Sequence, residues 1–213
     1  MNKTLILEPQ RVKSLTEGFF AVFQTQPTRF FSAPGRTEVG GNHTDHQRGR
    51  VLAAAVNLDT VAAVRPNGTK TVRIQSQGYP MCPVHLPNLQ PVEAEINSTP
   101  ALVRGVAARF AQMGCNVEGF DAYVESTVLP GSGLSSSAAF EVLVANIIND
   151  LFCDSRFTPV ELAQAGQYAE NVYFGKPSGL LDQMASSVGA MVTVDFKDNA
   201  VPVVARVDFD FAA

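Results

Sequence analysis

A run of glycines and serines is the part of this sequence best suited to bind an anion. It reads Leu129-Pro130-Gly131-Ser132-Gly133-Leu134-Ser135-Ser136-Ser137 and leads into an apolar segment. Glycines let backbone amides approach an anion, serines add hydroxyl donors, and a helix starting here would direct its positive dipole end at the same point. The run therefore predicts a phosphate-binding loop. It is neither a Walker A loop nor a dinucleotide GxGxxG motif, and a turn that only caps a helix is the alternative.

A second group of polar side chains is crowded between Pro34 and Gly49. Its members are Arg36, Glu38, Asn42, His43, Asp45, His46 and Arg48. So many directional donors and acceptors suit a polyhydroxylated ligand such as a sugar. A metal held by His43, Asp45 and His46 is one alternative, and a solvated polar loop is another.

A third candidate is Asp182, in the segment 175–183 that follows Glu170. We expect Asp182 in the first turn of a helix, where the dipole favours the ionised carboxylate. An anionic carboxylate in that place can act as a general base. The alternative is that it only completes the N-terminus of the helix.

Mixed helices and strands must position these groups. Apolar spacing predicts helices over 9–24, 99–112, 134–152, 158–173 and 178–189. A capping box at Thr158-Pro159-Val160-Glu161 begins the fourth of them. Alternation predicts strands over 28–33, 51–64, 71–74, 120–126, 191–196 and 201–209, with loops over 34–49 and 79–91. Asn67-Gly68 favours a hairpin between the second and third strands. Hairpins without regular βαβ alternation predict an α+β fold.

Composition excludes several classes of protein. The 213 residues fit one large domain or one and a half, 46% of them are hydrophobic, and the formal charge is −4. Such a chain is neither disordered nor a general nucleic-acid binder. Without a signal peptide or an apolar run of membrane-spanning length, we expect a cytoplasmic protein with no membrane partner. Cys82, Cys115 and Cys153 are then expected to be reduced thiols.

The three clusters, in this order, resemble the galactokinases of the GHMP small-molecule kinase superfamily. Residues 33–45 resemble the galactokinase signature, 129–139 are similar to the superfamily phosphate loop, and Glu170 with 179–183 resembles the segment bearing the catalytic aspartate. The resemblance implies the GHMP-kinase N-terminal domain, a ribosomal protein S5 domain 2-like fold with helices packed on a mixed sheet. It also implies transfer of phosphate from ATP to the anomeric hydroxyl of galactose, with Mg²⁺.

The resemblance further assigns roles. Asp182 would take or orient the proton of the anomeric hydroxyl, and Arg36 would keep Asp182 ionised. The sugar would contact Asn42, His43, Asp45 and Gly179. The ATP phosphates would contact Gly131, Ser132, Gly133, Leu134, Ser135, Ser136 and Ser137. Magnesium would be coordinated by Ser137 and Glu170.

Some positions depart from the family pattern and leave other functions open. Asn42 replaces the usual Glu, Thr37-Glu38 replaces Val-Asn, and His46-Gln47 replaces Tyr-Asn. A kinase for a related hexose or an amino sugar is therefore an alternative. The others are a non-catalytic galactokinase-like sugar sensor, whose mark would be loss of Arg36 or Asp182, a metal-dependent hydrolase, and a bare structural domain.

Galactokinases are nearly twice as long as this chain and have a further glycine-rich motif in their C-terminal half. No second glycine-rich loop follows Gly189. We therefore expect residues 1–213 to form the N-terminal GHMP domain, with the C-terminal GHMP domain absent and little activity from this chain alone. The chain would then be either a fragment or a truncated gene product. The sequence leaves the oligomeric state open.

Overall fold

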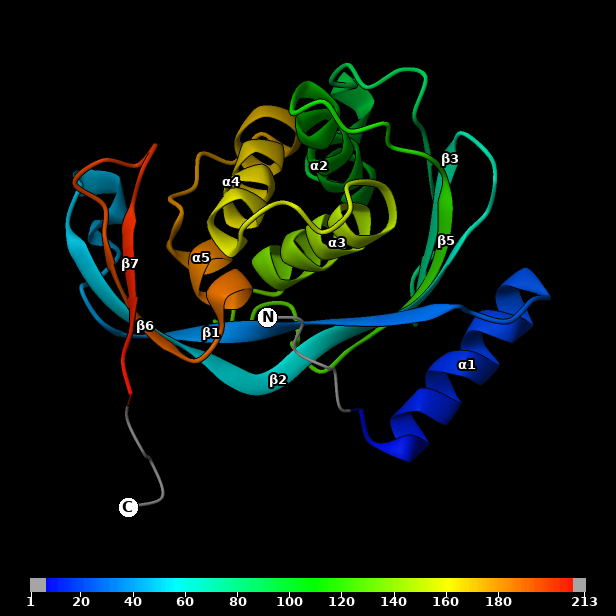
Figure 1. Ribbon diagram of the computed structural model, residues 1–213, viewed down its shortest axis with the longest axis horizontal. Helices are drawn as coiled ribbons and strands as arrows, with labels where there is room; N and C mark the ends of the chain where they lie inside the picture. The colour runs from blue at the N-terminus through cyan, green and yellow to red at the C-terminus, as the bar shows by residue number, and fades with distance from the viewer. Residues whose placement is uncertain (1–6, 209–213) are drawn as a thin grey trace.

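A curved mixed sheet holds most of the helices in its hollow. The computed structural model describes residues 7–208, and Figure 1 shows α2, α3, α4 and α5 on one face of the sheet and α1 on the other. The strands are β1 (Arg29–Gly40), β2 (Arg50–Pro66), β3 (Thr71–Ser76), β4 (Cys82–His85), β5 (Phe120–Ser126), β6 (Met191–Asp195) and β7 (Val203–Arg206). The helices are α1 (Pro9–Phe23), α2 (Thr99–Gln112), α3 (Ser136–Phe152), α4 (Pro159–Ala169) and α5 (Leu181–Val188), with short turns η1 (Thr44–Gln47), η2 (Glu93–Glu95) and η3 (Glu170–Phe174). The predicted α+β class is confirmed.

Strand β2 organises the sheet because it pairs with three other strands. It runs antiparallel to β1 along most of its length, and its other edge pairs first with β6 and then with β5. The resulting order is β4-β3-β5-β2-β6-β7, with β1 beside β2. β3 and β5 are parallel, whereas the other pairs are antiparallel.

Burial on both faces explains why β2 is an apolar run in the sequence. Val61 and Ala63 pack with Leu15 and Phe19 of α1, whereas Ala62 belongs to the core beneath α2 and α3. Successive side chains of a strand point to opposite faces, so a helix on each side requires apolar residues at consecutive positions.

The predicted hairpin through Asn67-Gly68 is wrong, because β5 lies between β2 and β3. The Asn67 side chain instead bonds Thr71 O at 3.0 Å and Asp121 Oδ1 of β5 at 2.8 Å. Tertiary pairing with a strand far along the chain therefore overrides the local turn signal. The predicted loop 79–91 likewise contains the short strand β4, in which Cys82 and Val84 are buried.

The boundary of the second polar cluster also differs from expectation. β1 does not end at Pro34 but continues to Gly40, with register shifts between Pro34 and Arg36 and between Glu38 and Gly40. Irregular pairing of this kind lets a strand accommodate proline. Arg36 and Glu38 consequently lie on a strand and not on a loop. The strand predicted over 201–209 is shorter than expected, and Phe209 lies outside the described residues.

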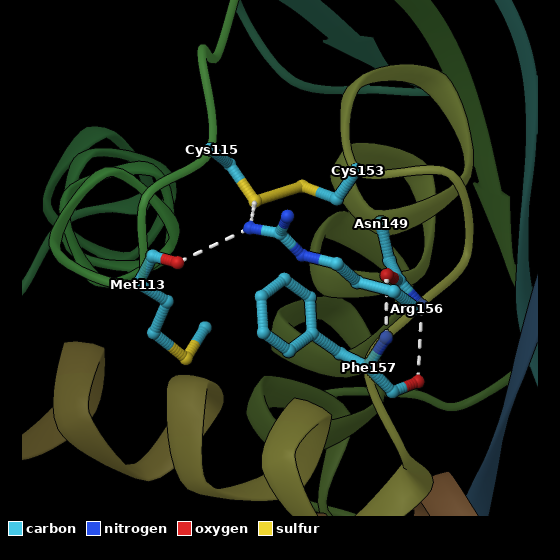
Figure 2. The surroundings of a disulfide bond; sticks show 6 residues. All are labelled: Met113, Cys115, Asn149, Cys153, Arg156 and Phe157. Atoms are coloured by element: carbon cyan, nitrogen blue, oxygen red, sulfur yellow. Dashed lines mark hydrogen bonds between the residues drawn. A yellow bond between two sulfur atoms is a disulfide. The ribbon is translucent and has the colours of Figure 1, made fainter.

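The expectation of three reduced thiols is wrong for one pair. Cys115 and Cys153 form a disulfide whose Cα atoms are 5.7 Å apart, with Arg156 beside it (Figure 2). Arg156 Nη2 donates to Met113 O at 3.2 Å and lies 3.5 Å from Cys115 Sγ. The pair joins the turn after α2 to the end of α3, elements that only tertiary packing brings together. Cys82 is free, and burial raises its pKa to about 12.

Candidate active site

Three segments that are distant in the sequence meet at Arg36. Its Nε donates to Asp182 Oδ1 at 2.7 Å, and its Nη1 donates to Gly133 O at 2.7 Å. Arg36 lies on β1, Gly133 in the glycine-serine loop and Asp182 in the first turn of α5. The structure therefore brings together the guanidinium, the carboxylate and the predicted phosphate loop.

Close backbone contact holds the loop against β1. Arg36 N donates to Leu134 O at 3.1 Å. A Cβ added to Gly35 would lie only 2.9 Å from the same oxygen. The glycine of the Pro-Gly-Arg sequence is thus needed for this approach, and any side chain there would push the loop away from Arg36.

The loop itself leaves room above its glycines. Gly131 and Gly133 have φ of 75° and 77°, and a Cβ on either would meet no atom within 4 Å. Ser135, with φ of 59°, is the N-cap of α3, so the helix begins at Ser136 and not at Leu134 as expected. The loop that leads into the helix N-terminus therefore borders open space at its two glycines, as an anion site requires.

Three of the loop hydroxyls have partners within the protein, and that of Ser137 contacts Glu170. Ser132 Oγ donates to Leu129 O at 2.7 Å, which closes the loop, and Ser135 Oγ donates to Asp182 Oδ2 at 2.5 Å. Sequence reasoning placed Ser135 only among the phosphate contacts. The structure adds a contact to the candidate base.

The surroundings of Asp182 keep its carboxylate ionised. Burial opposes ionisation, but the hydrogen bonds from Arg36 and Ser135 and the charge of Arg36 outweigh it, and they lower the pKa of Asp182 below its ordinary value. The side chain retains 28% exposure. Asp182 is therefore an accessible anion at neutral pH, able to accept a hydrogen bond or a proton.

Asp45 stabilises the local structure of the site. It is 2% exposed, and its Oδ2 accepts the Leu181 backbone N–H at 3.1 Å, at the start of α5. A Cβ at Gly179 would overlap this carboxylate, which explains the glycine. Asp45 Oδ1 is buried and has no hydrogen-bond partner in the described part of the chain.

The remaining predicted sugar contacts lie on an exposed turn. Asn42 and His43 have φ of 52° and 54°, in the left-handed region. Glu38 accepts the His43 backbone N–H at 2.8 Å and lies 3.3 Å from its Nε2. Sequence reasoning gave Glu38 no role of its own. Between residues 7 and 208 no three His, Cys, Asp or Glu side chains gather as a metal site, so the hydrolase alternative has no ligand set there.

Glu170 provides buried carboxylate oxygens beside the loop. It is 2% exposed, on the π-helical turn η3 that continues α4. Its Oε1 accepts from Lys176 Nζ at 2.8 Å and from Ser137 Oγ at 3.4 Å. A carboxylate and a hydroxyl are the hard oxygen ligands that Mg²⁺ prefers, and the Lys176 ammonium shows that a cation fits there. These residues therefore fit a magnesium ion.

Sequence reasoning missed the groups beneath Glu170. Gln183 Nε2 donates to Glu170 Oε2 and to Glu141 Oε2, both at 2.9 Å, and Gln183 and Glu141 are fully buried. Burial, and next the negative charge of Glu170, raise the pKa of Glu141 well above its ordinary value. A signal was present, because Glu141 is the only charged residue in the apolar run 138–148.

Replacing Glu141 with Gln is expected to stabilise the protein increasingly as pH rises. The pKa of Glu141 is higher in the folded protein than in the unfolded chain, where it is about 4.5. Its contribution to stability is therefore complete below the unfolded pKa and is lost as the pH rises through the folded pKa. For each unit that separates the folded from the unfolded pKa of Glu141, the free energy of unfolding of Glu141→Gln exceeds that of the wild type by about 1.4 kcal/mol at high pH. Urea unfolding at pH 5 and pH 8 measures it. Replacing Glu17, exposed on α1, with Gln is the control, and an equal pH response of both variants would contradict the prediction.

No helix among residues 7–208 is both long enough and apolar enough to cross a membrane.

Two family models match the chain. Residues 17–66 match the galactokinase galactose-binding signature, and residues 101–190 match the N-terminal domain of GHMP kinases. The first match contains Arg36 and Asp45, and the second contains the loop, Glu170 and Asp182.

Curated relatives include galactokinases of three genera. The chain is 36% identical to that of Lacticaseibacillus paracasei over 82% of this chain and 45% of the relative. It is 33% identical to that of Lactococcus lactis over 97% of this chain and 54% of the relative, and 34% identical to that of Streptomyces coelicolor over 92% and 51%. The chain thus spans about half the length of the curated relatives it matches.

Solved structures give the same picture of the fold. Lactococcus lactis galactokinase complexed with galactose superposes with a TM-score of 0.81 at 28% identity, over 93% of this chain and 52% of that one. A Bacteroides heptose 1-phosphate kinase, at 18% identity, shares the fold with a TM-score of 0.71, over 85% of this chain and 60% of that one. In sequence and in fold the chain is similar to galactokinases over about half of their length, and residues 101–190 match the N-terminal domain of GHMP kinases.

Proposed function

We propose that this chain is part of a longer protein, the full-length protein, that transfers the γ-phosphoryl group of ATP to the anomeric hydroxyl of galactose, giving galactose 1-phosphate and ADP. The observation that supports this most directly is the bonding of Arg36 to both Asp182 and the loop. It sets a candidate base beside a candidate phosphate site. The galactose-binding signature over residues 17–66 supports the choice of sugar.

The proposed reaction needs one proton acceptor and one nucleophile. Asp182 accepts the proton of the anomeric hydroxyl, or orients it, while the sugar oxygen attacks the γ-phosphorus and the bond to the ADP oxygen breaks. Arg36 keeps Asp182 ionised, and its guanidinium offsets negative charge that develops nearby. Positioning and electrostatic stabilisation supply most of the catalysis in such transfers.

The loop and the buried carboxylate would bind the nucleotide. A Cβ at Gly131 or Gly133 would meet open space, and these glycines precede the N-terminus of α3, so the loop 131–137 suits the ATP phosphates. Glu170 and Ser137 would hold Mg²⁺. When bound, Mg²⁺ neutralises phosphate charge. Lys176, which now bonds Glu170 Oε1, would yield this oxygen to the metal.

The sugar would lie against η1 and the start of α5. Asp45 Oδ1 is the buried free acceptor there, and Asn42 and His43 stand on the exposed turn beside it. Asn42 is uncharged, so a related hexose or an amino sugar is the second candidate substrate. A non-catalytic sensor is less well supported, because Arg36 and Asp182 are both present and paired.

A coupled ADP-release assay with a panel of sugars tests the proposal. We propose that a second GHMP domain completes the cleft. The full-length gene product should therefore turn over galactose at about 1–1000 per second, whereas the 213-residue chain should bind both substrates weakly and turn over poorly. A full-length protein inactive on every sugar would refute the kinase, and an equally active short chain would refute the need for the second domain.

A further inference from the structure

Three buried polar side chains form a network beneath the candidate metal ligands. Glu141 lies on α3, Gln183 on α5 and Glu170 on η3, and none is more than 2% exposed. The Gln183 amide donates one hydrogen bond to each carboxyl, both at 2.9 Å. The network therefore connects the helix that follows the phosphate loop, the turn that holds Glu170 and the helix that holds Asp182.

The two carboxylate oxygens of Glu170 have different partners. Oε2 points inward to Gln183, whereas Oε1 faces Ser137 and Lys176. A carboxylate whose inner oxygen is held in place cannot rotate freely, so its other oxygen stays directed at the loop. An amide NH₂ carries two donors and no charge, so it can donate to both carboxyl groups at once.

Packing against α4 fixes the Gln183 and Glu141 side chains. A Cβ added to Gly166 would lie 3.1 Å from Glu141 Cβ and 3.2 Å from Gln183 Cγ, so this glycine lets α4 approach closely. Glu141 Oε1 and Gln183 Oε1 have no hydrogen-bond partner in the described part of the chain. Unsatisfied buried acceptors lower the free energy of unfolding. A functional role of Gln183 and Glu141 at the candidate metal site of Glu170 would explain why the protein tolerates this cost.

We propose that Gln183, supported by Glu141, is a positioning residue that directs Glu170 toward the metal and fixes the rotation of α5, from which Asp182 projects. Because Gln183 follows Asp182 directly, an anchor on Gln183 also sets the direction of its neighbour. This inference rests on the proposed function for the identity of the ligand. Its geometry rests on the three side chains alone.

Replacement of Gln183 by Met in the full-length protein tests the proposal, since it keeps the length of the side chain and removes both donors. Manganese, a paramagnetic substitute for magnesium, is titrated by electron paramagnetic resonance in the presence of a non-hydrolysable ATP analogue. Metal affinity should fall about 10–100-fold, as it does when partners of metal ligands are removed. The kcat should fall by a similar factor, with the KM for galactose within threefold.

Asn149→Leu is the matched control. Asn149 is a buried polar residue, 7% exposed, at the far end of α3, the helix that carries Glu141, and its side chain bonds the backbone of Phe157. This variant should lose stability without losing metal affinity. If Gln183→Met binds manganese within twofold of the wild type, the network is only structural and the proposal is wrong.

A second pair of variants decides the matter if Gln183→Met does not fold. Glu141→Gln keeps an oxygen that can accept from Gln183, whereas Glu141→Met does not. The proposal requires Glu141→Gln to bind manganese more tightly than Glu141→Met, and equal affinities would overturn it. The metal titration is independent of turnover. An inactive wild type with a manganese affinity that depends on Gln183 would therefore refute the proposed kinase and leave this inference standing.

Discussion

Replacement of Asp182 by Asn should lower kcat of the full-length protein by about 10²–10⁴-fold, the usual contribution of a general base, and leave the dissociation constant for galactose within threefold. Asn cannot accept a proton at neutral pH. Its oxygen can still accept from Arg36, and its amide can donate to Ser135 Oγ, which changes from donor to acceptor. The geometry of the site should therefore survive while the chemistry is lost. Steady-state kinetics and calorimetric titration of the sugar measure the two effects separately.

The matched control removes a carboxylate from a similar ion pair elsewhere. Asp195 on β6 bonds Arg50 Nε at 2.7 Å, the same distance that separates Asp182 from Arg36. Asp195→Asn should leave kcat within twofold. If Asp182→Asn keeps more than a tenth of the wild-type kcat, Asp182 is not the proton acceptor.

Replacement of Gly179 by Ala should disrupt the site and destabilise the fold. The new Cβ would overlap Asp45 Oδ2, the atom that accepts the Leu181 N–H. Forcing a methyl group into a packed position costs about 1–3 kcal/mol. Displacing Asp45 and the start of α5 by about 1 Å can reduce kcat/KM by about 10²-fold. Thermal unfolding and the coupled assay measure both.

Gly40 provides the control for that variant. A Cβ at Gly40 would meet no atom within 4 Å, and its backbone is not in the left-handed region. Gly40→Ala should change the free energy of unfolding by no more than about 0.5 kcal/mol. If Gly179→Ala proves as stable and active as Gly40→Ala, Asp45 does not depend on a close approach of the backbone at 179.

The sequence allowed prediction of features that depend on local chemistry. The capping box at Thr158 begins α4 as expected, with both of its hydrogen bonds formed. A helix after the glycine-serine loop was predicted from the residue types at 131–137, and it begins at Ser136, two residues later than expected. The family resemblance predicted that Arg36 and Asp182 would lie together, and they are in contact.

Features set by long-range packing could not be predicted. Insertion of β5 between β2 and β3 depends on which strands meet in the folded sheet, and Asn67-Gly68 carries no information about that. The same holds for the disulfide, whose cysteines are 38 residues apart. The bond of Asp45 to Leu181 joins residues separated by 136 positions, so a residue expected only to contact sugar also holds a helix.

The bond from Arg36 to Gly133 O has a consequence for the order in which substrates could enter. In the proposed reaction it connects the residues expected to bind the sugar to the loop expected to bind the nucleotide, so the protein itself would set the spacing between the two substrates. Preorganisation of this kind spares each substrate the entropy of assembling the other's site. Either substrate could then arrive first and find its partner's site already shaped.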